Sequence, residues 1–177
     1  MRSTKSFLVV ILLPFLPTLS RAAPDEVTDF AYSVDMLLDV PLADIRSAQT
    51  FTITDLRDKD RKAVLGRLAS LPKLKTLKFN GCDLSHVDAS DPVPPKVETV
   101  LIDDGKVSQG TIRWLSKFPS GVEIVFGCDV RRLEFELGNF KWVTFDNCQV
   151  SKSAVIKLIE KMTQVTFKEV TLAAEAE

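Results

Sequence analysis

The sequence repeats one pattern of apolar and polar positions at intervals of 21 to 26 residues. Three segments match the spacing L-x-x-L-x-L-x-x-C-x-L, with other apolar residues replacing some leucines; they are 74–84, 97–107 and 140–150. The middle segment has Gly105 in place of the cysteine. Weaker copies begin at 48, 119 and 162, so six units are defined, starting at 48, 74, 97, 119, 140 and 162. A period of this length indicates a supersecondary unit repeated along the chain.

Within a unit, the apolar period predicts a strand followed by a second element. Leu77 and Phe79 alternate with polar residues, as do Val143 and Phe145, and this period of two is typical of a strand with one buried face. The spacing then becomes helical in three segments, 63–71, 112–118 and 154–162. Residues suited to N-caps precede them: Asp58, Ser108 and Ser151. Because one strand and one helix cannot bury both apolar faces alone, the units are expected to stack.

Two units depart from this scheme. The second has the proline-rich segment 88–95 in place of a helix, which favours an extended crossing. The fourth, over 119–139, alternates first at Val122, Ile124 and Phe126 and again from Leu133, so it is compatible with an extra strand. Its strand register stays open, because Cys128 matches the cysteine position only if the strand starts at Ser120.

The segments that flank the repeats predict a cleaved signal peptide, a capping helix and a frayed tail. Two basic residues, an apolar run of about ten residues and small residues before Ala23 are typical of a secretory signal peptide over 1–22. An uncleaved membrane anchor is the alternative, although the run is short of the roughly 20 residues that a spanning helix needs. Helical spacing from Val27 to Leu38 predicts an N-terminal capping helix, with its connection, over 23–47. We expect 173–177 to be a frayed tail.

Composition and charge exclude several classes of function. The chain has 23 Lys and Arg against 24 Asp and Glu, and removal of 1–22 leaves 20 against 24, a net charge of −4. This balance argues against a nucleic-acid partner, and Arg131-Arg132 is too short a basic patch to change that. The single histidine, His86, and seven glycines offer little for a metal centre or a phosphate loop. We therefore expect no metal and no cofactor.

The repeated motif resembles leucine-rich repeats, particularly the cysteine-containing type of ribonuclease-inhibitor-like proteins, over residues 48–172. The resemblance implies an α/β fold: a short solenoid with parallel strands on a concave face and helices or extended segments on the convex face. It also implies a protein whose work is binding, while the signal peptide predicts that the protein is secreted or periplasmic. In this repeat type the cysteine packs in the turn after the strand.

Three cysteines in an exported chain also raise the possibility of a disulfide. Cys82 and Cys148 are three units apart, too distant at about 4.8 Å per strand. Cys128 and Cys148 belong to adjacent units, so a bridge between them is feasible and competes with simple packing of both thiols.

Residues at outward strand positions are the candidate binding residues. Most are threonine or charged, but Leu101 and Trp142 are apolar, and Val125 is a further candidate from the fourth unit. The predicted partner-binding set is Lys78, Leu101, Asp103, Val125, Trp142, Thr144 and Asp146. The competing interpretation is that the apolar members pack beneath the irregular segment 127–139.

Two functions remain open from the sequence. The favoured one is a non-catalytic interaction module that binds a protein or cell-envelope component through the concave face, without stable membrane insertion once the signal is removed. The alternative is a small-molecule binder or enzyme that uses the irregular unit around 119–139, near His86 or the acidic strand ends at Asp103, Asp104 and Asp146. His86 matches no catalytic spacing, and the acidic residues are too few for a typical hard-cation loop.

Overall fold

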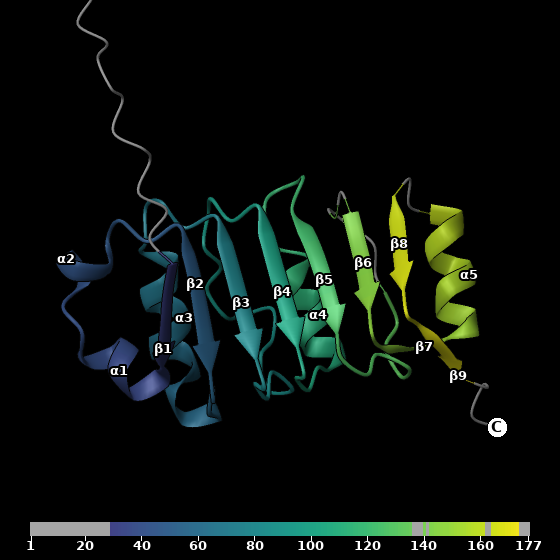
Figure 1. The fold of residues 1–177 in the computed structure, drawn as a ribbon, viewed down its shortest axis with the longest axis horizontal. Helices are drawn as coiled ribbons and strands as arrows, with labels where there is room; N and C mark the ends of the chain where they lie inside the picture. Colours follow the sequence, from purple (N-terminus) through teal and green to yellow (C-terminus); the bar gives the residue numbers. More distant parts are fainter. Residues whose placement is uncertain (1–28, 136–139, 141, 162–163, 174–177) are drawn as a thin grey trace, which may run out of the picture.

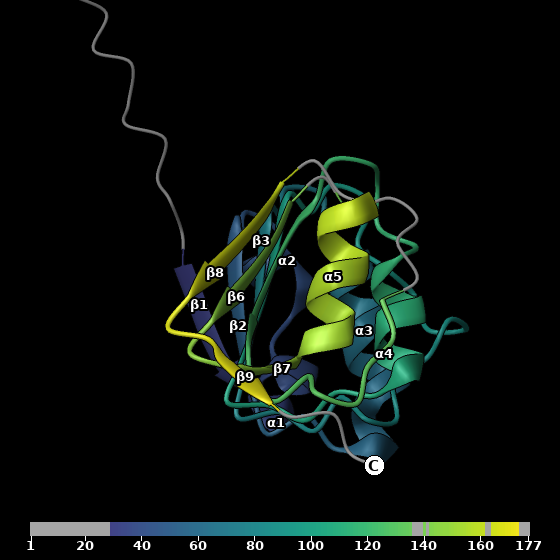
Figure 2. The ribbon, with the colours of Figure 1, turned by 90° about the vertical axis from the view of Figure 1, so that its right-hand side faces the viewer.

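The alternating residues of each unit form one strand of a continuous parallel sheet. The computed structural model describes residues 29–135, 140, 142–161 and 164–173. Within them, seven strands pair in parallel in the order β1-β2-β3-β4-β5-β6-β8, and the helices lie on one side of this sheet (Figures 1 and 2). The strands are β1 (Asp29–Ser33), β2 (Thr50–Thr54), β3 (Thr76–Asn80), β4 (Thr99–Asp103), β5 (Glu123–Gly127), β6 (Trp142–Asp146) and β8 (Val165–Lys168). The predicted α/β class with parallel strands is confirmed.

The core is a stack of inward side chains from successive strands. Phe51, Leu77, Val100, Ile124 and Val143 are aligned with one another across β2 to β6 and are fully buried. The row two residues further along ends in aromatic rings, which stack face to face at centroid distances of 5.7 Å for Phe126–Phe145 and 5.4 Å for Phe145–Phe167. Each strand therefore covers the apolar side chains of its neighbour, as the stacking argument predicts.

A left-handed residue follows most strands and turns the chain toward the next layer. Positive φ angles occur one residue after β2, β3, β4, β6 and β8, at Asp55, Gly81, Asp104, Asn147 and Glu169. Gly, Asn and Asp tolerate this conformation best, which explains four of the five. After the turn the chain makes a second set of parallel pairings, between β7 (Gln149–Ser151) and β9 (Thr171–Ala173) and at the isolated bridge Asp83–Lys106.

Three longer helices pack on the inner side of the sheet, and all three were predicted. They are α3 (Arg61–Ala69), α4 (Gln109–Leu115) and α5 (Lys152–Lys161). Ser108 caps α4 through a capping box with Thr111, and the Ser151 Oγ accepts a hydrogen bond from the Ala154 N–H at 3.2 Å. The third predicted cap is wrong: Asp58 opens the 3-10 helix η1 (Asp58–Asp60) and makes an ion pair with Arg61 at 2.8 Å, without capping α3.

The second unit crosses from β3 to β4 without a helix, as its prolines predict. Asp91 holds this crossing together, because its buried carboxylate accepts a hydrogen bond from the Asp88 N–H at 2.9 Å and contacts the Arg61 Nε at 3.1 Å. The Trp114 Nε1 donates to the Pro92 carbonyl at 3.1 Å. Side-chain hydrogen bonds thus replace the backbone ladder that a helix would supply.

The predicted N-terminal capping helix is only partly correct. Residues 29–33 form β1, which pairs in parallel with β2, and the helix α1 (Val34–Asp39) begins afterwards. Phe30 and Tyr32 alternate with exposed residues, so they also fit a period of two, and their rings pack on Phe51 at 6.5 and 5.6 Å. Pairing with β2 and packing of these rings on Phe51 favour a strand over the predicted helix. A short helix α2 (Leu42–Ile45) follows.

The fourth unit forms one strand, β5, aligned with β4 from Glu123 to Gly127. No strand occurs in 128–135, so the expected extra strand is absent from the described part of the unit. The strand does not start at Ser120. The turn after β5 has no residue with positive φ and is one residue shorter than its counterparts. Cys128 therefore lies two residues after the aligned Phe126, whereas Cys148 lies three after Phe145.

The ends of the predicted domain scheme are only partly covered by the structure. The signal peptide over 1–22 and the tail residues 174–177 lie outside the described residues. Ala173, assigned to the frayed tail, instead pairs with Ser151 in the β7–β9 ladder. In the described ranges, no helix has the length and apolar character to cross a membrane.

Arg61 contacts the exposed carboxylate of Asp58 and the buried carboxylate of Asp91. We expect loss of the buried one to destabilise the protein much more. We expect Asp91→Ala to lower the free energy of unfolding by about 3 kcal/mol, because it leaves the part-buried Arg61 Nε and the Asp88 N–H without their acceptor. Asp58→Ala removes only an exposed partner of the same arginine and should cost far less. Urea denaturation of the two variants measures both losses, and equal losses would contradict the role given to Asp91.

Candidate functional site

The outward side chains of neighbouring strands align in rows across the sheet, and several of the predicted binding residues share one row. Lys78, Leu101, Val125 and Thr144 are aligned with one another across β3, β4, β5 and β6. Neighbouring members therefore lie one strand spacing apart, about 4.8 Å. Val125, an open candidate at the sequence level, belongs to this row, and Ala31 and Thr52 extend it toward the β1 edge.

An apolar group occupies the middle of this outward face. Leu101 and Val125 are adjacent, and Trp142 projects from β6 two residues before Thr144, on the same face and beside Glu123 of β5. Leu101, Val125 and Trp142 are half-buried, while Thr144 is only 7% exposed. We call Leu101, Val125 and Trp142 the apolar group. The buried core is formed mainly by inward side chains, and none of the three members of the apolar group belongs to it.

The competing interpretation, packing beneath the irregular segment, is wrong for the described part of that segment. The Phe135 ring packs edge-on against Phe126 at 5.7 Å and Phe145 at 5.5 Å, and both of these are inward residues. Leu133 is buried with them. Residues 128–135 therefore lie on the helix side of the sheet, and Figure 2 shows no described element across the opposite face. We call that uncovered side the open face; residues 136–139 lie outside the described residues.

Acidic side chains gather where the central strands end. Asp103 and Asp146 end β4 and β6, and the Asp103 carboxylate lies over Gly127, where an added Cβ would come within 2.5 Å of its Oδ1. A polar pocket of about 390 Å³ opens at this edge. Its lining residues are Asn80, Asp103, Asp104, Gly127, Cys128, Asp129, Asn147, Cys148 and Gln149. In the described ranges, no three His, Cys, Asp or Glu side chains are placed to hold a metal ion.

The three cysteines are free thiols, so the feasible Cys128–Cys148 disulfide is not formed. Burial raises the pKa of the Cys128 thiol to about 12, with a further contribution from nearby Cys148, and raises the pKa of Cys148 to about 11. The Cys82 Sγ donates to the Ile53 carbonyl at 3.3 Å, and burial raises its pKa as well. Thiols that stay protonated are poor nucleophiles, so these residues fit the packing role that the repeat motif implies.

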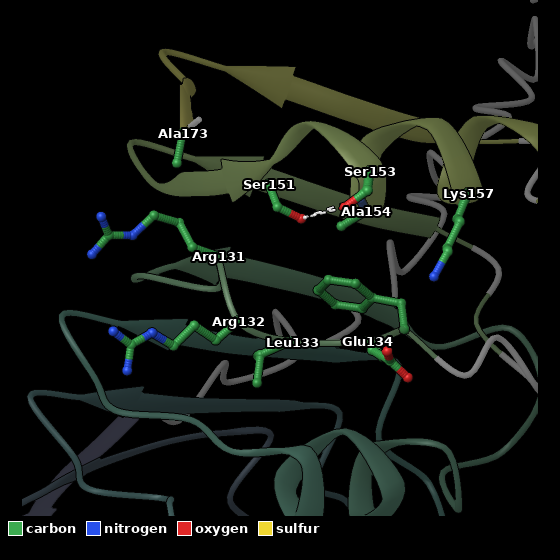
Figure 3. Close-up of a pocket in the computed structure, with 10 residues that line it drawn as sticks. Arg131, Arg132, Leu133, Glu134, Ser151, Ser153, Ala154, Lys157 and Ala173 are labelled. Atoms are coloured by element: carbon green, nitrogen blue, oxygen red, sulfur yellow. Dashed lines mark hydrogen bonds between the residues drawn. The ribbon is translucent and has the colours of Figure 1, made fainter. Parts of the chain in front are cut away.

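A larger pocket, of about 530 Å³, lies beside the irregular unit (Figure 3). Arg131 and Arg132 stand at one end and Lys157 at the other. Arg131 is bound to Asp129 through contacts of 2.6 to 3.0 Å, and the Ser151 and Ser153 hydroxyls are 3.4 Å from each other. The lining includes no histidine to act as a general base on either hydroxyl, and Glu134 and Lys157 are its other charged side chains. His86 is exposed and lies elsewhere, with its carbonyl bound by Arg61.

Comparison with known proteins adds no assignment. No protein-family model, curated protein or solved structure matches this chain.

Sequence reasoning missed two parts of the open face. Glu123, beside Trp142, was not placed because the register of the fourth unit was open. Ala31 was placed in a helix, although the alternation of Phe30 and Tyr32 was a signal for a strand. The predicted members Lys78, Leu101, Val125 and Thr144 do come together in one row, and Asp103 lies at its strand end.

The state of the cysteines gives a direct prediction. We expect three reactive thiols per chain after unfolding in the absence of reductant, because all three are free. In the folded protein at pH 8, labelling should be at least about 100-fold slower, since raised pKa values and burial keep the thiolate fraction low. Mass spectrometry after alkylation counts the labels. A single label on the unfolded chain, located on Cys82, would show that Cys128 and Cys148 are bridged.

Proposed function

We propose that this chain is an exported, non-catalytic interaction module of leucine-rich-repeat type, which binds a protein or cell-envelope partner through the open face. The observation that carries the proposal is the apolar group in the middle of that face. Its members are half-buried without being part of the core. Aromatic and aliphatic side chains surrounded by polar groups are typical of the energetic centre of an interface.

The surroundings of the apolar group support recognition of a partner with mixed chemistry. Lys78 lies next to Leu101 on one side, and Asp103 and Asp146 stand at the strand ends. Thr144 and Glu123 complete a polar border around the apolar side chains. A partner with one apolar contact patch and both basic and acidic groups at its rim would fit this arrangement, because rim charges fix orientation more than affinity.

The repeat architecture supports the family assignment proposed here. Each unit contributes one parallel strand in sequence order, followed by a turn and, in three units, a helix on the other side of the sheet. Cys82 packs in the turn after its strand, the position that the resemblance implies. In such scaffolds the inward positions maintain the stack, and binding depends on outward residues.

Catalysis has weaker support. His86 is exposed, and the buried thiols have raised pKa values. The pocket of about 530 Å³ near Arg132 and Lys157 is the place where the small-molecule alternative would operate.

The binding proposal is tested with Leu101→Ser/Trp142→Ser. We expect the double variant to lose a partner that the unaltered protein captures from the medium or envelope fraction of its source, because half-buried outward side chains supply the contact area. Its melting temperature should stay within a few degrees of the parent, since neither side chain belongs to the buried core.

A matched control changes outward residues away from the apolar group. Thr52 and Thr76 lie on β2 and β3 of the same face, and Thr52→Ser and Thr76→Ser should leave capture of the partner intact. Identical captures by the parent and the Leu101/Trp142 variant would refute the assignment of the site. A large drop in melting temperature of that variant would indicate that the apolar group is part of the packing.

Export is tested separately. We expect the mature protein to begin at Ala23, because small residues at Ser20 and Ala22 suit cleavage after Ala22. N-terminal sequencing of the protein from the extracellular or periplasmic fraction measures this. Ala22→Arg should block cleavage and retain residues 1–22. Recovery of the unaltered chain in the membrane fraction with 1–22 intact would show the uncleaved anchor instead.

A further inference from the structure

Large apolar side chains are exposed at both ends of the sheet, Met36 and Leu42 at the β1 end and three others at the β8 end, which we call the open end. Beside β1, the helix α1 buries Val34 and Leu37 almost completely. Beside β8, Val165 and Phe167 remain half-buried, although the residues aligned with them in β6, Val143 and Phe145, are fully buried. The last strand of the stack thus has a neighbour on one side only.

The helix α5 is the outermost element of the open end, beyond β8 in Figure 1, and Figure 2 looks directly onto it. Two of its isoleucines face solvent: Ile156 is 50% exposed and Ile159 is 60% exposed. Leu172 of β9, at the same end, is 57% exposed. These three are the majority of the five large apolar side chains that are exposed in the described part of the chain.

The charges on α5 show what kind of partner fits this surface. Ile156 stands four residues after Lys152 and four before Glu160, so the three side chains lie along one face of the helix. All three are exposed. If two α5 helices pack antiparallel and are centred on Ile156, Lys152 of one copy lies opposite Glu160 of the other, and the reverse pair forms symmetrically. A second copy of this chain therefore matches this surface in its apolar side chains and in the Lys152 and Glu160 charges, while the exposed Lys157 adds a further positive charge.

We propose that two copies of this chain associate through α5 as a two-fold dimer, with the helices antiparallel and the two Ile156 side chains at the axis. Each α5 covers Ile156 and Ile159 of the other, and the Lys152–Glu160 pairs set the register. Because the helices are antiparallel, the two-fold axis is perpendicular to both α5 helices. The dimer stands independently of the proposed binding function, but it would present two binding faces together.

The test measures association of the exported, processed protein by sedimentation equilibrium over about 1 to 200 µM, a range suited to a small interface. We expect a concentration-dependent dimer. Ile156→Glu/Ile159→Glu should weaken it at least about 100-fold, because two charges are then placed in the apolar contact. Both side chains are solvent-exposed in the single chain, so the melting temperature of the monomer should change little.

Charge exchange tests the antiparallel register itself. Lys152→Glu and Glu160→Lys should each weaken the dimer, because each places like charges opposite one another, and the double exchange should restore it. Met36→Glu, at a residue 54% exposed on α1 at the β1 end, is the control and should leave association unchanged. A monomer at every concentration, a dimer that survives the isoleucine changes, a dimer lost in Met36→Glu, or a double exchange that fails to restore association would each overturn the proposal.

Discussion

Every unit of this chain depends on its neighbour to bury its inward side chains. Phe51, Leu77, Val100, Ile124 and Val143 are completely buried only because the next strand and the helices behind it cover them. A strand slipped by one residue would expose these side chains and bury threonines and charges instead, so the parallel register is strongly specified. The same dependence makes the ends of the stack special, because the last unit lacks the neighbour that all the others have. The chain places α1 at the β1 end and α5 at the β8 end, and among the described residues both ends keep some large apolar side chains exposed.

Much of this architecture was predictable, because the core requirement leaves a regular trace in the sequence. The alignment of Thr50, Thr76 and Thr99, and of Lys78 with Leu101, follows from the spacing alone. The crossing at 88–95 was predictable from its prolines, although the buried carboxylate of Asp91 that secures it was not. Local patterns failed where two periods fit the same residues. Phe30 and Tyr32 suit either element, and only pairing with β2 selects the strand. In the fourth unit, the turn after β5 is shortened by one residue, and motif matching has no means of locating such a deletion.

The candidate site was predictable to the extent that it depends on strand register. The row through Lys78, Leu101, Val125 and Thr144 came together as expected. The spacing did not indicate on which side of the sheet residues 128–135 lie. That side decides whether this segment covers the apolar group. Phe135 shows the side for that segment through its contacts with Phe126 and Phe145, because residues 128–135 form no helix there and the ring packs in the inner layer. The cysteines illustrate the same principle, since burial that helps the stack also raises the pKa values of Cys128 and Cys148 and makes both poor nucleophiles.

The division between inward and outward positions also explains where function can reside. Inward residues are constrained by packing, where loss of one large side chain costs several kcal/mol. Outward residues of a solvated sheet face have no such constraint, and threonine or charge is the favourable choice there. Leu101, Val125 and Trp142 depart from that choice on three consecutive strands of the sheet, where all three are half-buried. The proposed binding face rests on this departure, because apolar side chains at outward positions are the ones that could supply the centre of an interface.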